Sequence, residues 1–228
     1  MMNEHKLVAQ HFENCIDVSR YTLTEEYDYG CVPLCAIDSV FSIGIRYTNV
    51  INIVSRVCRK MNIIKAYEKE KQSSVTTSWF LEQISDKTPE DLASHLFESR
   101  HRTSPKNGIL KAEAVVRFMQ VLTQFGVEHL EDVSKVTDSV AFELAIKAIP
   151  GQTSGICLKY FLMLAGDSEL IKPDRMIIRF LESALNRPVS LHEAVGLVRR
   201  ACDELKHKYD FMTPKILDNL IWQYQRSL

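Results

Sequence analysis

Apolar residues recur at every third or fourth position through the first part of the chain. Between Pro33 and Arg59 these positions are Leu34, Ile37, Phe41 and Ile45, followed by Val50, Ile53, Val54 and Val57. This spacing places the apolar side chains on one face of an α-helix. We expect two helices here, with a break between Gly44 and Thr48.

The same helical pattern continues along the chain. Residues 109–126 are amphipathic with a helical period, and a new apolar pattern starts near Trp79 after the polar stretch 69–78, which we interpret as a loop. No segment alternates apolar and polar side chains over the length of a strand, and Asn107-Gly108 leads into a helical pattern. The sequence therefore predicts an all-α fold with at least eight helices.

Three of the expected helices begin with capping sequences. Residues 88–91 (TPED) combine a threonine cap, a proline in the first helical position and acidic residues in the first turn. Residues 190–193 (SLHE) fit a capping box, and Thr213-Pro214 repeats the Thr-Pro start. These signals predict where the three helices start.

Composition limits the cellular compartment, the metal sites and the cofactors that we expect. Of the 228 residues 46% are hydrophobic, yet no apolar run approaches the roughly 18–20 residues that a membrane helix needs. The N-terminal sequence MMNEHKLVAQHFENC lacks the apolar stretch of a secretory signal, so we expect a cytoplasmic protein without membrane contact, nucleoid-associated if prokaryotic. The six cysteines contain no CxxC pair. We therefore expect buried thiols, no metal site and no cofactor.

The overall charge gives no general attraction to nucleic acid. The formal net charge is −1, so a DNA-binding protein of this composition needs a local basic surface. Basic residues do cluster within 56–60, 100–106 and 199–208. Each cluster also fits an ordinary solvated helix face, so none of them identifies a partner by itself.

Residues 146–181, IKAIPGQTSGICLKYFLMLAGDSELIKPDRMIIRFL, carry the strongest functional signal. One helical pattern ends near Ala148, a turn follows at Pro150-Gly151, and an apolar helical pattern begins after Gly155. Such a turn directs backbone N–H groups outward at the start of the second helix, where the helix dipole favours an anion such as a DNA phosphate. An ordinary corner between two helices produces the same Pro-Gly dipeptide.

Asp174 follows the hairpin after one helix and a short loop, immediately before RMIIRFLESAL. An aspartate in this position is by itself more simply a helix N-cap than a catalytic group. The hairpin, the intervening helix and the aspartate in this order are a more specific signal than either part alone.

This order of features resembles the helix-hairpin-helix (HhH-GPD) superfamily of DNA glycosylases, and within it the endonuclease III-like group. The family signature is Leu-Pro-Gly-x-Gly, a helix, and a Pro/Val-Asp before another helix. Here IPGQTSGICLKYFLMLAGDSELIKPDRMIIRF covers it at matching spacing. The resemblance extends more weakly to VPLCAIDSVFSIGIRYTNVINIV and SPKNGILKAEAVVRFMQVL, and so to most of residues 30–187.

The resemblance implies a fold, a partner and a reaction. The fold is a two-lobed helical one with a cleft between the lobes: residues 1–30 and 156–228 form a terminal lobe, and residues 31–155 form a central lobe that ends in the hairpin. The partner is double-stranded DNA, from which a damaged or modified base is flipped out and excised. Asp174 takes the catalytic position, where its carboxylate orients or deprotonates a nucleophile and stabilises the positive charge that develops on the sugar. The residues implied in DNA binding are Pro150, Gly151, Gln152, Thr153, Ser154, Gly155 and Lys159 around the hairpin, and Arg46 and Tyr47 at the family's DNA-wedge position.

The chain departs from the family pattern in ways that change the expected chemistry. Gly155 stands where bifunctional members carry the lysine that forms a Schiff base, so the implied enzyme is monofunctional and uses water. Thr153 replaces the second glycine of the hairpin, which adds a hydroxyl but restricts positive φ. Only Cys202 occurs after Asp174, so the iron–sulfur cluster of many relatives is not expected.

Three functions remain compatible with the sequence. The first is a monofunctional base-excision glycosylase that acts through Asp174. The second is a DNA-binding or damage-sensing protein of the same fold with weak or no catalysis, which the near-neutral charge and the altered hairpin favour. The third is a structural helical interaction protein, in which Pro150-Gly151 is only a turn and Asp174 only a cap.

Overall fold

The computed structural model describes residues 3–20, 29–64, 74–166, 171 and 174–228 of the chain. Within these ranges the regular secondary structure is helical without a strand, apart from a bridge residue at Tyr29 and an isolated antiparallel bridge between Arg102 and Leu110. The predicted all-α class is confirmed. The chain divides into two compact units, unit 1 with Met1–Thr24 and Asp167–Leu228, and unit 2 with Glu25–Gly166.

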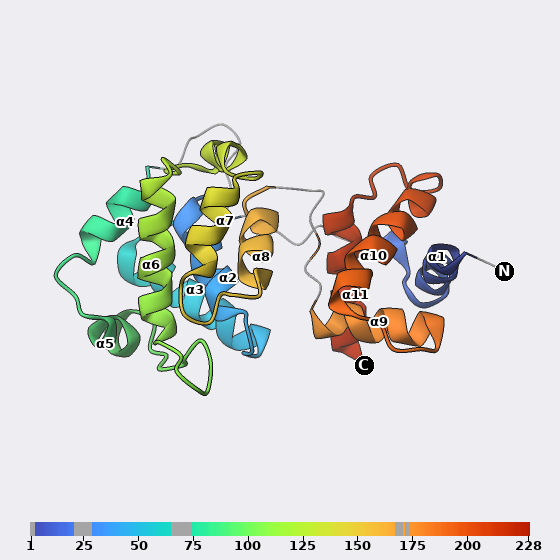
Figure 1. Ribbon diagram of the computed structural model, residues 1–228, viewed down its shortest axis with the longest axis horizontal. Helices are drawn as coiled ribbons and strands as arrows, with labels where there is room; N and C mark the ends of the chain where they lie inside the picture. Colours follow the sequence, from blue (N-terminus) through green and yellow to red (C-terminus); the bar gives the residue numbers. More distant parts are fainter. Residues whose placement is uncertain (1–2, 21–28, 65–73, 167–170, 172–173) are drawn as a thin grey trace. The chain divides into compact units, whose positions relative to one another are not determined.

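Unit 2 is built around one fully buried helix. Every residue of α2 (Val32–Phe41) is buried, and α2 packs against α3, α6 and α8. Figure 1 shows α2 among the other helices of this unit. These are α3 (Tyr47–Met61), α4 (Thr77–Gln83), α5 (Pro89–Asp91), the π-helical turn η3 (Leu92–Leu96), α6 (Lys111–Gln124), the 3-10 helix η4 (Leu130–Lys135), α7 (Val140–Lys147) and α8 (Ile156–Leu164).

Helix α8 belongs to unit 2 because of its contact with α2. The sequence predicted the boundary of the central lobe at residue 155, whereas the division of the structure lies between residues 166 and 167. Most side chains of α8 are apolar and buried, among them Tyr160, Phe161 and Leu162. The second helix of the hairpin is therefore fixed by the core of unit 2.

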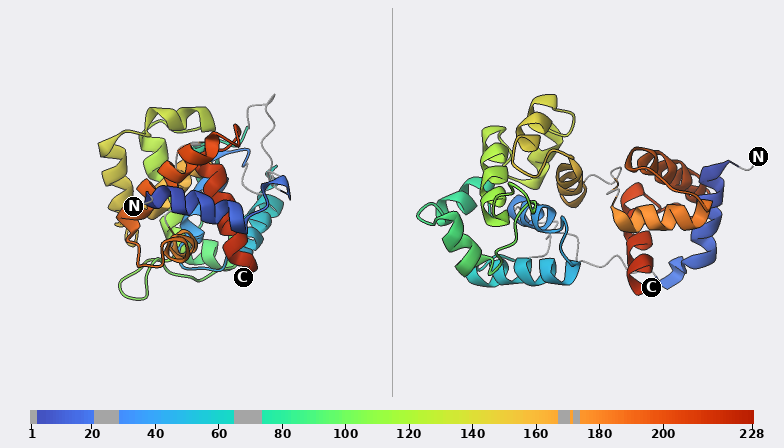
Figure 2. Two further views of the ribbon diagram at one scale, coloured as in Figure 1. Left: turned by 90° about the vertical axis from the view of Figure 1, so that its right-hand side faces the viewer. Right: turned by 60° about the horizontal axis from the view of Figure 1, so that its bottom comes forward.

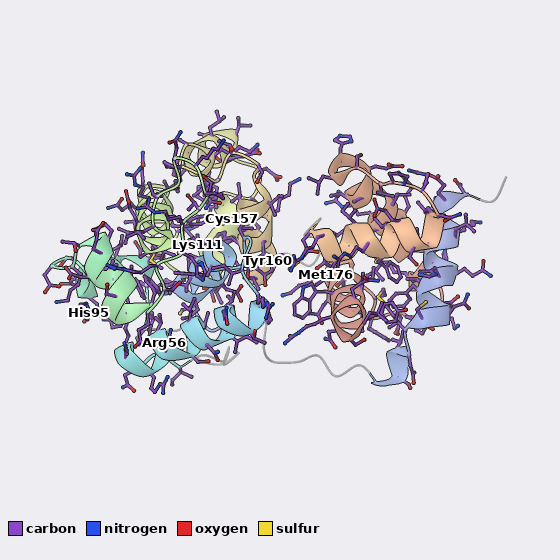
Figure 3. All side chains as sticks on the ribbon, turned by 90° about the horizontal axis from the view of Figure 1, so that it is seen from below. Arg56, His95, Lys111, Cys157, Tyr160 and Met176 are labelled. Carbon is purple, nitrogen blue, oxygen red and sulfur yellow. The ribbon has the colours of Figure 1, made fainter. Side chains whose placement is uncertain are left out.

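A buried lysine closes the C-terminal end of α2. Lys111 is 2% exposed, and its Nζ donates hydrogen bonds to the backbone carbonyl oxygens of Val40 (2.9 Å), Phe41 (3.0 Å) and Ile43. The last carbonyl groups of a helix have no intrahelical donor, and an ammonium group offers three. Figure 3 shows Lys111 in the interior of unit 2. The sequence did not predict this role, because residue 111 reads only as one polar position of an amphipathic helix.

Unit 1 contains α1 (Glu4–Cys15), the 3-10 helix η1 (Val18–Arg20), α9 (Arg175–Leu185), α10 (Leu191–Lys206) and α11 (Pro214–Ser227). Helix α1 packs against α9 and α10, and α11 packs against the same two helices. Figure 2 shows the N-terminal helix beside the C-terminal ones. Residues from all four helices form the core, including Phe12, Phe180, Leu197 and Ile221.

The expected capping box at α10 is only half formed. Ser190 accepts a hydrogen bond from the backbone N–H of Glu193, as predicted. The Glu193 carboxylate, however, pairs with Arg187 instead of returning to residue 190. The same guanidinium donates to Glu4 at 2.9 and 2.8 Å. Arg187 thus links α1 to the connection between α9 and α10, and a charged fork-shaped donor is a stronger partner than a backbone amide.

The other predicted helix limits agree with the structure, except for the start of α4. Helix α2 ends at Phe41 and α3 begins at Tyr47, and the break contains Gly44 with φ +72°. Thr88 forms a reciprocal capping box at α5, and Thr213 caps α11. In the predicted loop 69–78, residues 69–73 lie outside the described residues, and α4 already begins at Thr77.

Candidate functional site

The predicted helix, turn and helix are present between α7 and α8. Backbone hydrogen bonds from Gln152 N to Ile149 O (2.9 Å) and from Gly155 N to Gln152 O (3.0 Å) close two successive turns. Gly151 and Gly155 adopt φ values of +86° and +71°. Both glycines therefore hold left-handed conformations that other residues adopt only at a cost.

Gly151 is required by a contact as well as by its backbone conformation. A Cβ atom added to Gly151 would lie 2.4 Å from Cβ and 2.6 Å from Oγ1 of Thr103. The hairpin turn therefore packs closely against the loop between η3 and α6. This contact brings the basic segment 100–106 beside the hairpin, which the sequence did not predict.

The loop that contacts the hairpin has a defined structure and carries unpaired basic side chains. Thr103 N donates to Ile109 O (2.9 Å), and Arg102 donates to Gly108 O (2.6 Å). Arg100 and Lys106 are exposed, and neither side chain forms an ion pair or hydrogen bond with any residue in the described part of the chain. Arg102 holds the loop together, while Arg100 and Lys106 remain available to an external anion.

The N-terminus of α8 has no side-chain cap from its N-cap residue, because that residue is Gly155. Ser154 Oγ accepts a single long hydrogen bond from Ile156 N at 3.4 Å. Thr153 and Ser154 are exposed, and Thr153 does not adopt a positive φ, so it fits this turn without strain. The side chain of Lys159, in the first turn of α8, is exposed and has no partner among the described residues. Hydroxyl groups and a cation therefore surround an open helix start.

Lys147 is a further cation at this helix start, and it was not among the candidates from the sequence. Its Cε would lie 2.9 Å from a Cβ added to Gly155. Its Nζ pairs with Glu143 one turn earlier in α7. The left-handed backbone opposes a side chain at residue 155, whereas the flexible end of the Lys147 side chain can move aside. The backbone conformation of residue 155 is suited to glycine in this structure.

The predicted hairpin residues do not all face outward. Gln152 is 3% exposed, Gly155 is buried and Pro150 is half-buried. A contact between the Gln152 side chain and DNA would require this side chain to leave the interior. The outer surface of the hairpin consists of Gly151, Thr153, Ser154 and Lys159.

Arg46 and Tyr47 differ sharply in accessibility. Arg46 is exposed, and its side chain forms no ion pair or hydrogen bond with a described residue. Tyr47 is half-buried and its hydroxyl is shielded from solvent. Its phenol contributes, after burial and Asp38, to raising the pKa of Tyr29. Tyr47 thus faces the interior near Tyr29, and Arg46 is the accessible residue of the pair.

The interior beside Tyr47 contains a carboxylate that accepts a hydrogen bond on each of its oxygens. Asp38 is fully buried and accepts hydrogen bonds from Tyr29 Oη (2.6 Å) and Ser42 Oγ (2.7 Å), one on each carboxylate oxygen. Because burial and this carboxylate raise the pKa of Tyr29, the phenol stays protonated and remains the donor. The Asp38 carboxylate thus fixes α2 and is enclosed by protein.

Asp174 is the N-cap of α9. Its Oδ1 accepts hydrogen bonds from Met176 N (2.8 Å) and Ile177 N (3.2 Å), while its Oδ2 accepts none from the described residues. The side chain is half-buried, and Figure 3 labels Met176 at the start of α9. The structure therefore brings the hairpin, the basic loop and Lys147 together in unit 2, and places Asp174 in unit 1 with one oxygen engaged in capping.

Metal sites, cysteine thiols and membrane-spanning helices are the other features of the described residues that bear on function. They contain no group of three or more His, Cys, Asp or Glu side chains that could hold a metal ion. All six cysteines are free, and burial raises the pKa of the Cys31 thiol to about 12. In the same parts of the chain, no helix has the length and apolar character needed to cross a membrane.

Comparison with known proteins gives one match. No curated protein and no solved structure matches the chain. One family model, described as a domain of unknown function (DUF8548), matches residues 6–226. Since this match covers almost the whole chain, the protein belongs to the DUF8548 family.

Proposed function

We propose that this protein is a monofunctional DNA glycosylase of base excision repair, with the two-lobed helical fold of the HhH-GPD superfamily and Asp174 as its catalytic carboxylate. The observation that carries the proposal is the hairpin of unit 2. Its glycine turn leads into a helix start without an N-cap side chain, and that start is surrounded by accessible hydroxyl and basic groups. This combination supports binding to the phosphates of a nucleic acid backbone.

The proposed DNA contact uses two neighbouring segments of unit 2. Thr153, Ser154 and Lys159 offer two hydroxyls and an ammonium at the start of α8. The Thr103–Gly151 contact adds the loop that carries Arg100 and Lys106. These cations supply the local basic surface that a chain of net charge −1 needs for DNA binding.

The geometry of Asp174 also supports a role in hydrolysis. Two backbone N–H groups hold Oδ1 and thereby fix the carboxylate, while Oδ2 is left to accept a proton from water. In the proposed reaction the water oxygen bonds to the sugar C1′ and its proton passes to Oδ2. The N-glycosidic bond breaks, and the base leaves with the bonding electron pair. The negative carboxylate stabilises the positive charge on the sugar during this step.

A second candidate function is DNA binding without base excision. It is favoured by the capping hydrogen bonds of Asp174, which give this side chain a structural role that requires no chemistry. In this case the hairpin and the basic loop bind the DNA backbone, and damage is sensed without cleavage. The two candidates make the same prediction for DNA affinity and opposite predictions for product formation.

The discriminating experiment is incubation with duplexes that each contain one methylated, oxidised or deaminated base, followed by alkali to cut abasic sites. We expect cleavage of at least one duplex by the native protein, and none by Asp174→Asn. Asparagine keeps an oxygen that can cap α9, so this variant should fold with an unchanged melting temperature. Equal cleavage by the two proteins would refute the role of Asp174. DNA binding without any cleavage would favour the second candidate.

Borohydride trapping tests the monofunctional part of the proposal. Because residue 155 is a glycine, no Schiff base should form there, and no covalent adduct with DNA should accumulate. Lys159 lies one turn further along α8. An adduct that disappears in Lys159→Gln would show that this amine replaces the missing lysine, and the enzyme would then be bifunctional.

A further inference from the structure

Unit 2 contains a pocket that none of the hairpin residues line. Its volume is about 430 Å³, and it lies between the C-terminal end of α3, helix α4 and the segment formed by α5 and η3. This volume falls within the range of small-molecule sites, roughly 300–1,000 Å³. Side chains of Trp79, Ile84 and Leu92 provide apolar walls, and Asn62, Gln83 and His95 provide polar ones.

The backbone beside this pocket is irregular. Leu92–Leu96 form a π-helical turn in which Phe97 N donates to Leu92 O at 2.9 Å, and Leu92 and His95 from this turn line the pocket. Glu98 follows with φ +46°, which is uncommon for a residue with a side chain. π-Helical turns and strained backbone are concentrated at functional sites. Ion pairs from Glu98 to Arg56 (3.0 Å) and Lys60 (2.6 Å) hold this conformation.

The polar groups on the pocket wall form a defined set of donors and acceptors. His95 Nδ1 lies 3.1 Å from the backbone carbonyl oxygen of Asp91, which can only accept, so Nδ1 carries the proton. In the tautomer with the proton on Nδ1, Nε2 is an acceptor. The side-chain amides of Asn62 and Gln83 form no hydrogen bond with a described residue, and each can both donate and accept. Figure 3 shows His95 on η3 and Arg56 on α3, the two segments that the Glu98 ion pairs join.

Both lysines on the pocket wall are paired with carboxylates, which disfavours an anionic ligand. The Lys60 ammonium binds the Glu98 carboxylate and the carbonyl oxygen of His95. Lys87 pairs with Asp86 at 2.6 Å. Asp91 accepts hydrogen bonds from the backbone N–H and the hydroxyl of Thr88. A ligand would therefore meet an aromatic ring, amides, an imidazole nitrogen and the Asp91 carboxylate, and no unpaired cation among the described residues.

We propose that this pocket binds an uncharged planar heteroaromatic ring with donors and acceptors along its edge, the chemistry of a nucleobase. The ring stacks on Trp79, His95 Nε2 accepts from an N–H group of the ring, and the amides of Asn62 and Gln83 complete the edge contacts. Such a ring is available in a free base or nucleoside, or in an unpaired nucleotide of a single strand. The proposal is independent of the hairpin and of Asp174.

Tryptophan fluorescence provides the test, because the chain has two tryptophans and they lie in different units. In Trp222→Phe the remaining signal comes from Trp79. We expect saturable quenching by at least one of the common free bases or nucleosides, and none by ribose alone. Calorimetry with the unsubstituted chain should give the same affinity. If no base, nucleoside or single-stranded oligonucleotide produces saturable quenching, the proposal is overturned.

Variants connect the binding to His95 and separate the two sources of the ring. His95→Ala should weaken binding about fivefold to tenfold, the usual effect of one lost hydrogen bond. His101→Ala, which removes another exposed histidine of unit 2, should leave the affinity unchanged.

Binding of nucleosides indicates a free ligand, and binding of oligonucleotides alone indicates a strand-borne base. Equal affinity in His95→Ala and the unsubstituted chain would contradict the assignment, provided that the melting temperatures agree. Lys147→Gln with Lys159→Gln should weaken duplex binding only, so failure of one proposal is distinguishable from failure of the other.

Discussion

The N-termini of α8 and α9 differ in how the unpaired backbone N–H groups of the first helical turn are treated. Each helix starts with N–H groups that have no partner within the helix. At α9, Asp174 supplies a carboxylate oxygen that accepts from two of these groups at 2.8 and 3.2 Å. At α8, Gly155 supplies no side chain, and the nearest substitute is a hydroxyl contact of 3.4 Å. The start of α9 is satisfied internally, and the start of α8 is open to an external anion.

The surroundings of the two helix starts extend this difference. Around α8 lie Lys147, which pairs with Glu143, the accessible Lys159 and the neighbouring basic loop. At α9 the negative charge is already part of the chain. A helix start that binds a ligand must remain uncapped in the free protein, and that costs stability. The start of α9 is therefore optimised for folding, whereas the start of α8 is available for binding.

The largest expected effect concerns the glycine turn that precedes α8. In Gly151→Ala the new Cβ lies 2.4 Å from Thr103, and the alanine must adopt φ +86°. We therefore expect a loss of about 2–4 kcal/mol in the free energy of unfolding. Urea denaturation measures this loss. The matched control is Gly126→Ala, where φ is +71° and no atom lies within 4 Å, so only the conformational cost of about 1–2 kcal/mol applies. Equal losses in the two variants would show that the Thr103 contact has no energetic weight.

A smaller effect is expected at the start of α9. Asp174→Ala removes the cap and should lower the free energy of unfolding by about 1 kcal/mol, whereas Asp174→Asn should change it little. Thermal or urea unfolding distinguishes the two. Ser190→Ala, which removes the N-cap of α10 in the same unit, should resemble Asp174→Ala. If Asp174→Ala proves as stable as the native protein, its cap bonds contribute nothing and a purely structural role is excluded.

The electrostatic difference should be visible in DNA binding. Lys159→Gln and Lys147→Gln should each lower the slope of log affinity against log salt concentration by about one, if each lysine neutralises one phosphate. Fluorescence anisotropy with a labelled duplex at several salt concentrations measures this slope. Lys206→Gln, on α10, serves as a control with an unchanged slope. A slope that stays the same in both hairpin variants would argue against phosphate binding at α8.

The smallest effect tests whether α9 can be made to resemble α8. Asp174→Gly removes the carboxylate but keeps a residue that starts helices well, so the loss of stability should be only a few tenths of a kcal/mol. The uncapped start should then bind sulfate, and sulfate should raise the melting temperature of the variant more than that of the native protein. If sulfate has the same effect on both, a missing cap is insufficient to create an anion site, and the basic residues around α8 provide the rest.

Features set by short stretches of sequence were predicted well. The break between α2 and α3, the start of α5 at Pro89 and the start of α11 at Pro214 all lie where apolar spacing and capping residues predicted them. The helix, turn and helix around Pro150-Gly151 also follow from local rules. These features depend on side chains within about one helical turn of each other, and such interactions are visible in the order of residues.

Features that depend on distant contacts were not predicted. Lys111 reads as one polar residue of an amphipathic helix, and only its contact with Val40, Phe41 and Ile43 shows that it closes α2. Arg46 and Tyr47 are neighbours that the sequence favours equally, but burial near Tyr29 makes the Tyr47 hydroxyl inaccessible. In both cases the deciding partner lies far along the chain or on another helix, where residue spacing carries no information.

The sequence by itself determined the all-α class, the helix starts and the order of hairpin, helix and aspartate, because capping and amphipathic spacing act between near neighbours. Only the tertiary structure decided that Thr103 packs on Gly151 and brings a basic loop to the hairpin, that α8 is anchored on α2, and that Lys147 covers Gly155. It also decided which side chains of the hairpin are accessible, since burial depends on the whole core. The chain order identifies the candidate site, and long-range packing determines which of its groups can reach a ligand.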